Sequence, residues 1–220
     1  MRALITCVAM GLLGCASPNL YVSARPLGRG VVQHTIALEG LGAVTPAGAA
    51  VVPTAPTWQV RVGLGDRVDI LGRLVNLSGL GMDVLVSLYQ GPVDLAVVPG
   101  LRGTYLPFSA GRPGMLSTHL PLLMAVHLTD RWTLLATAGG GVATALGRSA
   151  SAEQTSLALA ENTESSSQGF FLRGGLGVRW RVTQGLLLHP EVTVLVTPAS
   201  GRATIVGGIG VVFGGVEHDG

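Results

Sequence analysis

The stretch Thr57–Leu74 reads TWQVRVGLGDRVDILGRL, and apolar and polar residues alternate on both sides of its Gly65-Asp66-Arg67 step. The apolar positions of the two halves are Trp58, Val60, Val62, Leu64, Val68, Ile70 and Leu74. Successive side chains of a β-strand point to opposite faces, so this period of two predicts two strands, and the step between them predicts a tight turn. The stretch is therefore interpreted as a β-hairpin with one apolar face.

The same alternation recurs along the rest of the chain. It occupies residues 31–41, 82–89, 95–102, 120–128, 132–138, 172–182, 186–196 and 203–213. With the two arms of the hairpin this makes about ten strands, within a range of about eight to twelve. Most of them are about nine to eleven residues long, which is the length of a tilted strand that crosses a lipid bilayer.

The connections between these strands are unequal in length. Tight turns are expected at 65–67, 91–93, 129–131 and 183–185, whereas the other connections are longer and fall at 42–56, 76–81, 104–117, 144–169 and 197–202. Short turns at one end and longer loops at the other are typical of outer-membrane barrels. An even number of strands then places both ends of the barrel at the short-turn side.

The composition favours a membrane-spanning sheet. Hydrophobic residues make up 48% of the 220 residues and charged residues only 12%. After Leu13 no apolar run reaches the ~18 residues of a spanning helix. Within lipid every backbone N–H and C=O group must be paired inside the protein, so an apolar β-chain has to close its sheet.

This pattern resembles that of small outer-membrane β-barrel proteins. The resemblance implies an all-β fold over residues 29–215: a closed antiparallel transmembrane β-barrel with short periplasmic turns and longer outer loops, followed by a short tail at 216–220.

The opposite face of the strands carries the charges. We expect a polar network in the lumen made of Arg61, Arg73, Arg102, Arg173, Arg179, Arg181, Glu39, Asp69, Asp83, Asp94 and Glu191. An arginine that faced lipid instead would cost roughly 2–4 kcal/mol near the midplane, whereas inside it can bridge carboxylates through its planar fork. The same inward face includes Leu71, Leu85, Leu123, Leu135 and Leu187, which predicts a lumen filled by side chains.

The N-terminus carries a targeting signal. Arg2 precedes the apolar run Ala3–Leu13, and residues 12–15 read LLGC. A short basic start, a short apolar core and a small residue before the cleavage point describe a secretory signal. LLGC resembles the lipobox of bacterial lipoproteins. The resemblance implies a signal peptide at 1–14, cleavage between Gly14 and Cys15, an acyl group on Cys15, and a linker over 15–28 that leads to an anchor in the inner leaflet of the outer membrane. The alternative is an ordinary signal peptide with an incidental cysteine.

Few residues point to chemistry. His119, His127 and His189 fall on the inward face, where we interpret them as hydrogen-bonded lumen residues rather than as ligands or catalytic groups. The longest loop holds Glu153, Glu161 and Glu164 but no histidine, and the glycines of 175–177 and 208–210 do not complete a nucleotide-binding motif. Only one cysteine other than Cys15 is present, and it lies in the signal. We therefore expect no catalytic residue, no metal and no cofactor.

The expected function is that of an outer-membrane β-barrel lipoprotein with a non-enzymatic structural, assembly or surface-interaction role. Two alternatives remain open: a periplasmic, soluble, β-rich lipoprotein, and a barrel-rim enzyme or small-solute channel. The expected partners are membrane lipids and an envelope protein that contacts the loops at 43–56 and 149–168. A net charge of +2 with dispersed arginines argues against a nucleic-acid partner.

Overall fold

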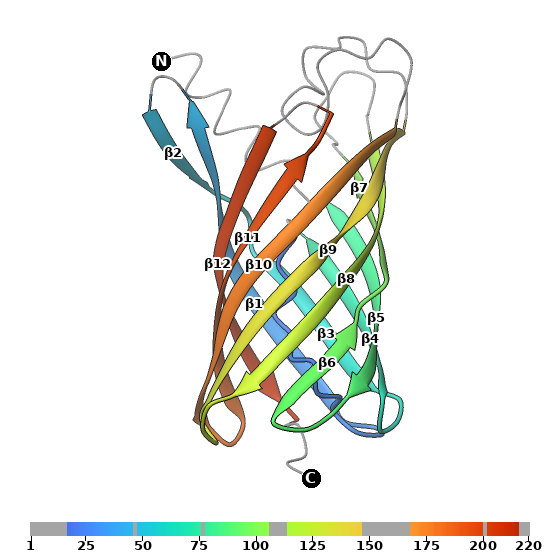
Figure 1. The fold of residues 1–220 in the computed structure, drawn as a ribbon, viewed down its shortest axis with the longest axis vertical. Coiled ribbons are helices and arrows are strands. Elements are labelled where there is room, and N and C mark those ends of the chain that lie inside the picture. Colours follow the sequence, from blue (N-terminus) through green and yellow to red (C-terminus); the bar gives the residue numbers. More distant parts are fainter. Residues whose placement is uncertain are drawn as a thin grey trace.

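The computed structural model describes residues 17–45, 48–75, 78–105, 114–146, 168–199 and 202–215. They form one antiparallel sheet that curls into a barrel (Figure 1). Its strands are β1 (Val32–Thr45), β2 (Gly48–Pro53), β3 (Thr57–Gly63), β4 (Val68–Val75), β5 (Gly79–Tyr89), β6 (Val93–Val97), β7 (Gly100–Tyr105), β8 (Gly114–His127), β9 (Trp132–Leu146), β10 (Gln168–Thr183), β11 (Leu186–Thr197) and β12 (Arg202–Gly214).

The barrel has ten positions around its circumference. Strands β6 and β7 occupy one position, because both pair with β5 and β8 and are separated only at Val98-Pro99. Strands β2 and β3 occupy another, because both pair with β1 on either side of the break at 54–56. Pairing of β1 with β12, from Gln33 opposite Gly214 to Gly42 opposite Ile205, closes the ring. The predicted closed antiparallel barrel of about ten strands is confirmed.

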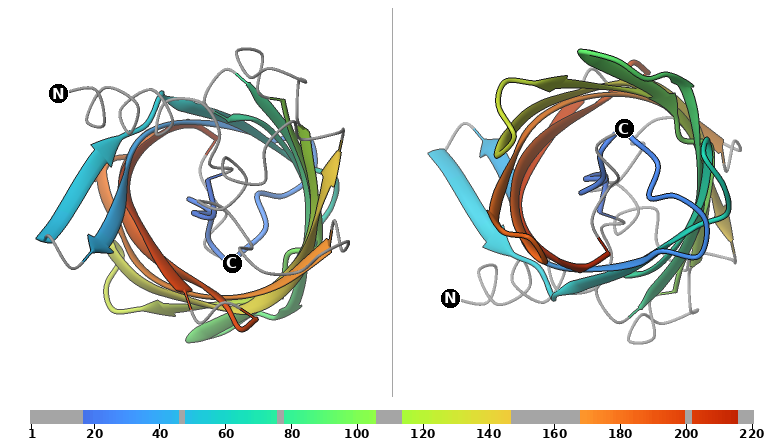
Figure 2. Two further views of the ribbon diagram at one scale, coloured as in Figure 1. Left: turned by 90° about the horizontal axis from the view of Figure 1, so that it is seen from above. Right: turned by 90° about the horizontal axis from the view of Figure 1, so that it is seen from below.

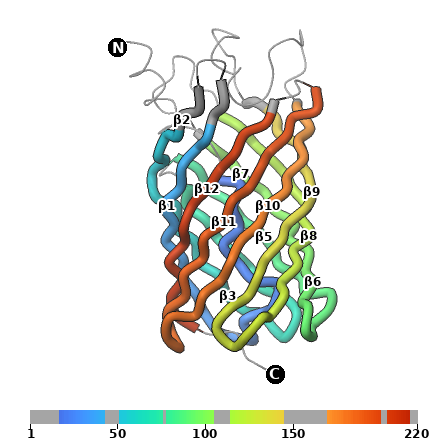
Figure 3. Tube along the Cα trace, turned by 60° about the vertical axis from the view of Figure 1, so that its left-hand side comes forward, coloured from blue at the N-terminus to red at the C-terminus, as the bar shows by residue number. Residues whose placement is uncertain are grey.

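The two ends of the barrel differ. The connections 64–67, 90–92, 128–131 and 184–185 lie at one end, where β1 also begins and β12 ends (Figure 3). We call this the short-turn end and the opposite one the long-loop end. At the long-loop end the strands run further than the sequence pattern indicates, since β8 begins at Gly114, β9 ends at Leu146 and β10 begins at Gln168.

The predicted loop at 42–56 is wrong in its first part. Ala43–Thr45 pairs with 48–50, and Leu41 and Gly42 pair with Val52 and Val51, so β1 and β2 form a hairpin beyond the closed wall. The Pro/Ala-rich composition of this stretch obscured the hairpin, because proline is rare inside strands. Among the described residues, Pro53 takes a paired position opposite Gly40 and Pro56 lies in the break at 54–56. The polar loop predicted at 149–168 lies almost entirely outside the described residues.

The outer face of the barrel is apolar. Large hydrophobic side chains on it are well exposed, for instance Leu120 at 58% and Leu176 at 70%. Trp132 stacks on Trp180 with ring centroids 5.4 Å apart. His34 is a polar residue on this face, and it stacks on Phe213 at 5.5 Å and on Trp58 at 6.1 Å. A belt of exposed apolar side chains on a closed sheet is the surface that a lipid bilayer covers.

The described part of the chain contains no helix long and apolar enough to cross a membrane.

The lumen contains a stretch of the chain itself. Residues Ser17–Leu27, which we call the luminal segment, lie inside the ring when the barrel is viewed along its axis (Figure 2). The segment descends to the short-turn end, where Gly28 and Gly30 take left-handed φ angles of 85° and 79° and turn the chain into β1. Backbone hydrogen bonds link Gly30 to Gly63 and Val31 to Gly28 at this turn.

The path of this segment differs from the expected one. The sequence suggested a linker that leaves the barrel at the short-turn end and reaches a membrane anchor there. Instead residues 17–27 fold back into the barrel, because the lumen offers them both an apolar wall and partners for their backbone groups. Leu20, Val22 and Ala24 share one buried apolar cluster with wall residues Leu71, Leu85, Ala96, Val98, Leu123, Ala125 and Leu135. The inward leucines thus pack against a chain segment, and the idea that wall side chains alone fill the lumen is wrong.

Candidate functional site: the luminal segment and its charged wall

Wall carboxylates accept hydrogen bonds from the backbone of the luminal segment. The two oxygens of Glu191 accept from the amides of Leu20 and Tyr21 at 2.9 and 2.8 Å. Asp69 accepts from the amide of Leu27 at 3.2 Å. Buried backbone amides need a partner, and hydrogen bonds to a charged acceptor are the stronger ones. These wall carboxylates therefore take the place of the carbonyl groups that a neighbouring strand would offer to the amides.

Wall arginines satisfy the carbonyl groups of the same segment. Arg73 donates to the carbonyl oxygens of Asn19 and Leu20 at 2.6 and 2.9 Å. Arg61 donates to the carbonyl of Arg25 at 2.5 Å, and Arg102 donates to that of Ser17. The guanidinium group suits this role because it carries five donors in a fixed plane and stays charged.

Glu39 of β1 accepts hydrogen bonds from three side chains of the luminal segment. Its Oε1 accepts from Ser17 Oγ at 2.5 Å, from Asn19 Nδ2 at 3.0 Å and from the Tyr21 hydroxyl at 2.8 Å. The Tyr21 ring fits against β12 only because two wall positions are glycine. A Cβ atom on Gly208 would lie 2.2 Å from the Tyr21 hydroxyl, and one on Gly210 would lie 2.9 Å from Tyr21 Cδ1.

The wall charges also pair with one another. Asp83 lies 2.7 Å from Arg73, 3.7 Å from Arg102 and 3.0 Å from His119. Asp69 lies 2.6 Å from Arg61. These side chains are nearly fully buried, and a buried charge is tolerated when it is paired and hydrogen-bonded. The charged side chains of the wall therefore bind the luminal segment and also pair with one another.

The remaining residues of the expected network fall into the same interior. Asp94 binds Arg25 of the luminal segment at 3.0 Å and His127 at 2.6 Å. Glu191 lies 3.6 Å from His189. Arg173 and Arg179 are buried in the lumen, and Arg181 is half-buried near the short-turn end.

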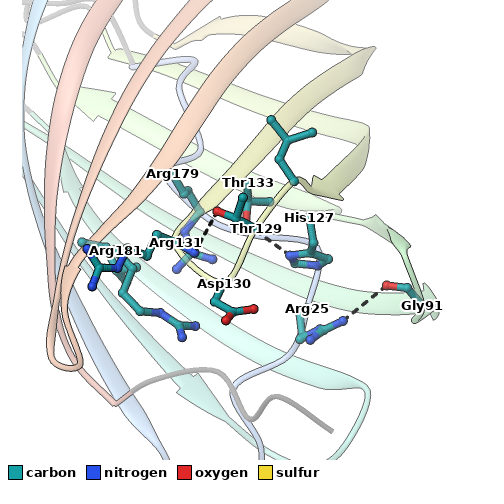
Figure 4. A pocket seen from close by; sticks show the side chains of 11 residues that line it. Arg25, Gly91, His127, Thr129, Asp130, Arg131, Thr133, Arg179 and Arg181 are labelled. Carbon is teal, nitrogen blue, oxygen red and sulfur yellow. Dashed lines mark hydrogen bonds between the residues drawn. The ribbon is translucent and has the colours of Figure 1, made fainter.

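Two acid–histidine pairs of the interior differ in exposure. The side chain of Asp83 has no exposed surface and that of its partner His119 only 3%, whereas His127 (Figure 4), which lies 2.6 Å from Asp94, is 25% exposed. Among the described residues no group of three or more His, Cys, Asp or Glu side chains is placed to hold a metal ion. The arrangement binds and orders a peptide backbone.

Sequence reasoning missed the luminal segment itself. Residues 17–27 contain no alternation and no charge apart from Arg25, so they read as a linker. The informative pattern lay in the wall strands instead. Inward leucines, inward glycines on β12 and inward charges on most of the strands together indicate a lumen that another part of the chain fills.

The fold and the site define a membrane-type β-barrel that its own N-terminal segment fills. No protein-family model and no curated protein matches the sequence. Among solved structures the chain is similar to the outer membrane protease OmpT from Escherichia coli, at 7% identity over 84% of this chain and 94% of that one, with a TM-score of 0.43.

It is also similar to the attachment invasion locus protein Ail of Yersinia pestis, at 10% identity over 85% and 98% of the two chains, with a TM-score of 0.38. The translocator domain of the autotransporter NalP from Neisseria meningitidis matches at 13% identity over 96% and 94%, with a TM-score of 0.39. The pairing of this chain's own strands establishes the barrel.

Proposed function

We propose that this protein is a non-enzymatic β-barrel of the bacterial outer membrane that is closed by its own luminal segment and acts through its surface. The observation that supports this most directly is the burial of Ser17–Leu27, whose backbone donors and acceptors bind charged wall side chains. We therefore expect no continuous water column through this lumen. The parts left to interact are the long-loop end, the lipid-facing belt and the short-turn end.

The orientation follows from the loop lengths. Barrels of the outer membrane turn tightly on the periplasmic side and carry longer loops outside. In that orientation the β1–β2 hairpin and the long-loop ends of β7, β8, β9 and β10 face the exterior, and they are the proposed surface for an envelope or surface partner.

We also propose that Cys15 carries an acyl group, as the LLGC motif implies. Cys15 lies outside the described residues, two positions before Ser17.

The test of the proposal uses the purified full chain, folded in detergent. A barrel migrates faster on a gel before heating than after it, and a closed barrel gives no steady conductance in a planar bilayer. We expect both results. Loss of the heat-dependent shift would contradict the barrel, whereas a stable, large open channel would leave the barrel intact and contradict its closure.

A further inference from the structure

The β1–β2 hairpin carries an open edge of the sheet. It extends past the closed wall at the long-loop end, and both views along the barrel axis show it outside the ring (Figure 2). Among the described residues, β2 pairs with β1 and with no other strand. Val51, in the second half of β2, is 76% exposed. The edge of β2 that faces away from β1 is therefore accessible.

The register of the hairpin defines which backbone groups this edge offers. The amide of Thr54 donates to the carbonyl oxygen of Glu39 at 2.9 Å, and the pairing of β2 with β1 continues from these two residues. In an antiparallel pair, residues that exchange hydrogen bonds alternate with residues whose N–H and C=O groups point away from the partner strand. Ala49, Val51 and Pro53 are of the second kind. The open edge therefore presents the N–H and C=O groups of Ala49 and Val51 and the C=O group of Pro53.

This edge lacks the usual protection against added strands. Edge strands of natural proteins are commonly blocked by charged side chains, by proline or by bulges. No charged residue occurs between Glu39 and Arg61, and Pro53 lies at the end of β2 rather than at the positions of Ala49 and Val51. Because an open sheet edge does not occur in hydrocarbon, these backbone groups lie on the aqueous side of the membrane. A strand can therefore be added to them from the aqueous side.

A second copy of this chain does not fit the edge within one membrane. All copies would have the same orientation, so each β2 would run from the long-loop end towards the bilayer. A two-fold axis along the membrane normal keeps that direction and makes two tilted strands cross, whereas an antiparallel neighbour must run the opposite way (Figure 1). The geometry therefore favours a segment of another protein.

We propose that the open edge of β2 binds an extended, uncharged segment of a surface partner protein as an added antiparallel strand. This mode of recognition rests on the surface role proposed above and specifies the partner segment. Backbone hydrogen bonds to Ala49 and Val51 hold the segment, and an apolar β-branched residue opposite Val51 is preferred. At ~3.4 Å per residue, the six residues of β2 match a segment about 20 Å long.

The experiment measures hydrogen exchange of single backbone amides by NMR in the full chain, folded in detergent. The probe is a synthetic six-residue peptide of alternating threonine and valine with blocked termini. Before the peptide is added, the amides of Ala49 and Val51 should exchange freely, whereas those of Ala50 and Val52, which point towards β1, should be protected. The peptide should slow exchange at Ala49 and Val51 at least roughly tenfold, the factor that one net hydrogen bond contributes.

Two variants separate backbone recognition from side-chain contact. Val51→Pro removes an N–H group that points away from β1, so the hairpin keeps its pairing while peptide binding should weaken roughly tenfold. Val51→Ala is the matched control, because it shortens the side chain and keeps the N–H group, so it should still bind the peptide. The heat-dependent gel shift verifies the fold of each variant. A fully N-methylated form of the peptide, which cannot donate hydrogen bonds, should not bind the wild type.

Two results would overturn the proposal. Equal binding of the two peptides, or equal binding by Val51→Pro and Val51→Ala, would show that no strand is added. Protection of Ala49 and Val51 before the peptide is added would show that the edge is already covered, and light scattering of the same sample would tell a second copy from the chain itself. Neither result changes the gel shift or the conductance, so each differs from a failure of the barrel or of its closure.

Discussion

Tyr21 shows how strongly one residue of the luminal segment depends on the wall. Its φ angle of 51° lies in the left-handed region, which residues other than glycine seldom adopt. Three contacts hold it there: the amide bond to Glu191, the hydroxyl bond to Glu39, and the space left by the glycines of β12. Strain of this kind persists only where the surroundings fix the conformation.

Replacing Gly210 with a larger residue should therefore displace the luminal segment from its place in the lumen. In Gly210→Val the new side chain would overlap the Tyr21 ring and approach Thr35 Cγ2, 3.1 Å from the Cβ position. We expect a loss of about 1–3 kcal/mol in stability, the usual cost of overpacking, and faster proteolysis within residues 17–27. Gly207→Val is the control, because Gly207 lies on the same strand and its Cβ would meet only Val192 at 3.6 Å. Equal stability and equal rates of proteolysis in the two variants would contradict the packing of Tyr21 against Gly210.

Cys15 allows a second test at the scale of one residue. Only a thiol can take the thioether-linked lipid of a lipoprotein, so Cys15→Ser should abolish acylation and leave an uncleaved or mislocalised precursor. Metabolic labelling with a radioactive fatty acid measures this, and Cys7→Ser is the control because Cys7 lies in the same predicted signal peptide. Labelling that survives in Cys15→Ser would show that LLGC is not a lipobox.

At the scale of elements, the strands could be predicted from the sequence and the luminal segment could not. Alternation is a local property: Trp58, Val60 and Val62 reveal their common face without knowledge of any other strand. The segment 17–27 has no such pattern, since its partners Glu39, Arg73 and Glu191 are distant in sequence and meet only once the barrel is closed. The hairpin β1–β2 was missed for a related reason, because its pairing depends on the extension of β1 beyond the wall.

The alternation makes a prediction for β10. Leu176 is 70% exposed on the outer face. In Leu176→Arg a charge would face acyl chains, and we expect a cost of about 2–4 kcal/mol if the position lies near the midplane, with reduced insertion into vesicles. Leu176→Ile keeps the apolar surface and should insert like the wild type. Unfolding in lipid vesicles under urea measures the difference, and equal stability of both variants would mean that this face does not meet lipid.

At the scale of the molecule, the barrel and its occupant form one structure with a shared core. A ten-stranded barrel is wider than the eight-stranded size whose interior wall side chains just fill. In this protein residues 17–27 fill that additional space. The charged side chains of the wall point into the lumen, whereas a soluble protein would expose them to water. Paired charges inside and apolar residues outside are the inverse of a soluble fold, and this inversion explains why a chain with only 12% charged residues can be stable in lipid.

Closure by a segment, rather than by wall side chains, predicts that the barrel can be opened and closed again. A variant that lacks residues 17–27 keeps every strand, so it should still show the heat-dependent gel shift. Its lumen then holds uncovered charges and water, and we expect an ion conductance that the wild type does not show. A synthetic peptide of residues 17–28, added at high concentration because the covalent tether no longer supplies its effective concentration, should reduce that conductance. A peptide of the same composition in scrambled order is the control, since it cannot place Tyr21 between Glu39 and Glu191. A shortened barrel that folds and stays closed without the peptide would show that the wall alone seals the lumen.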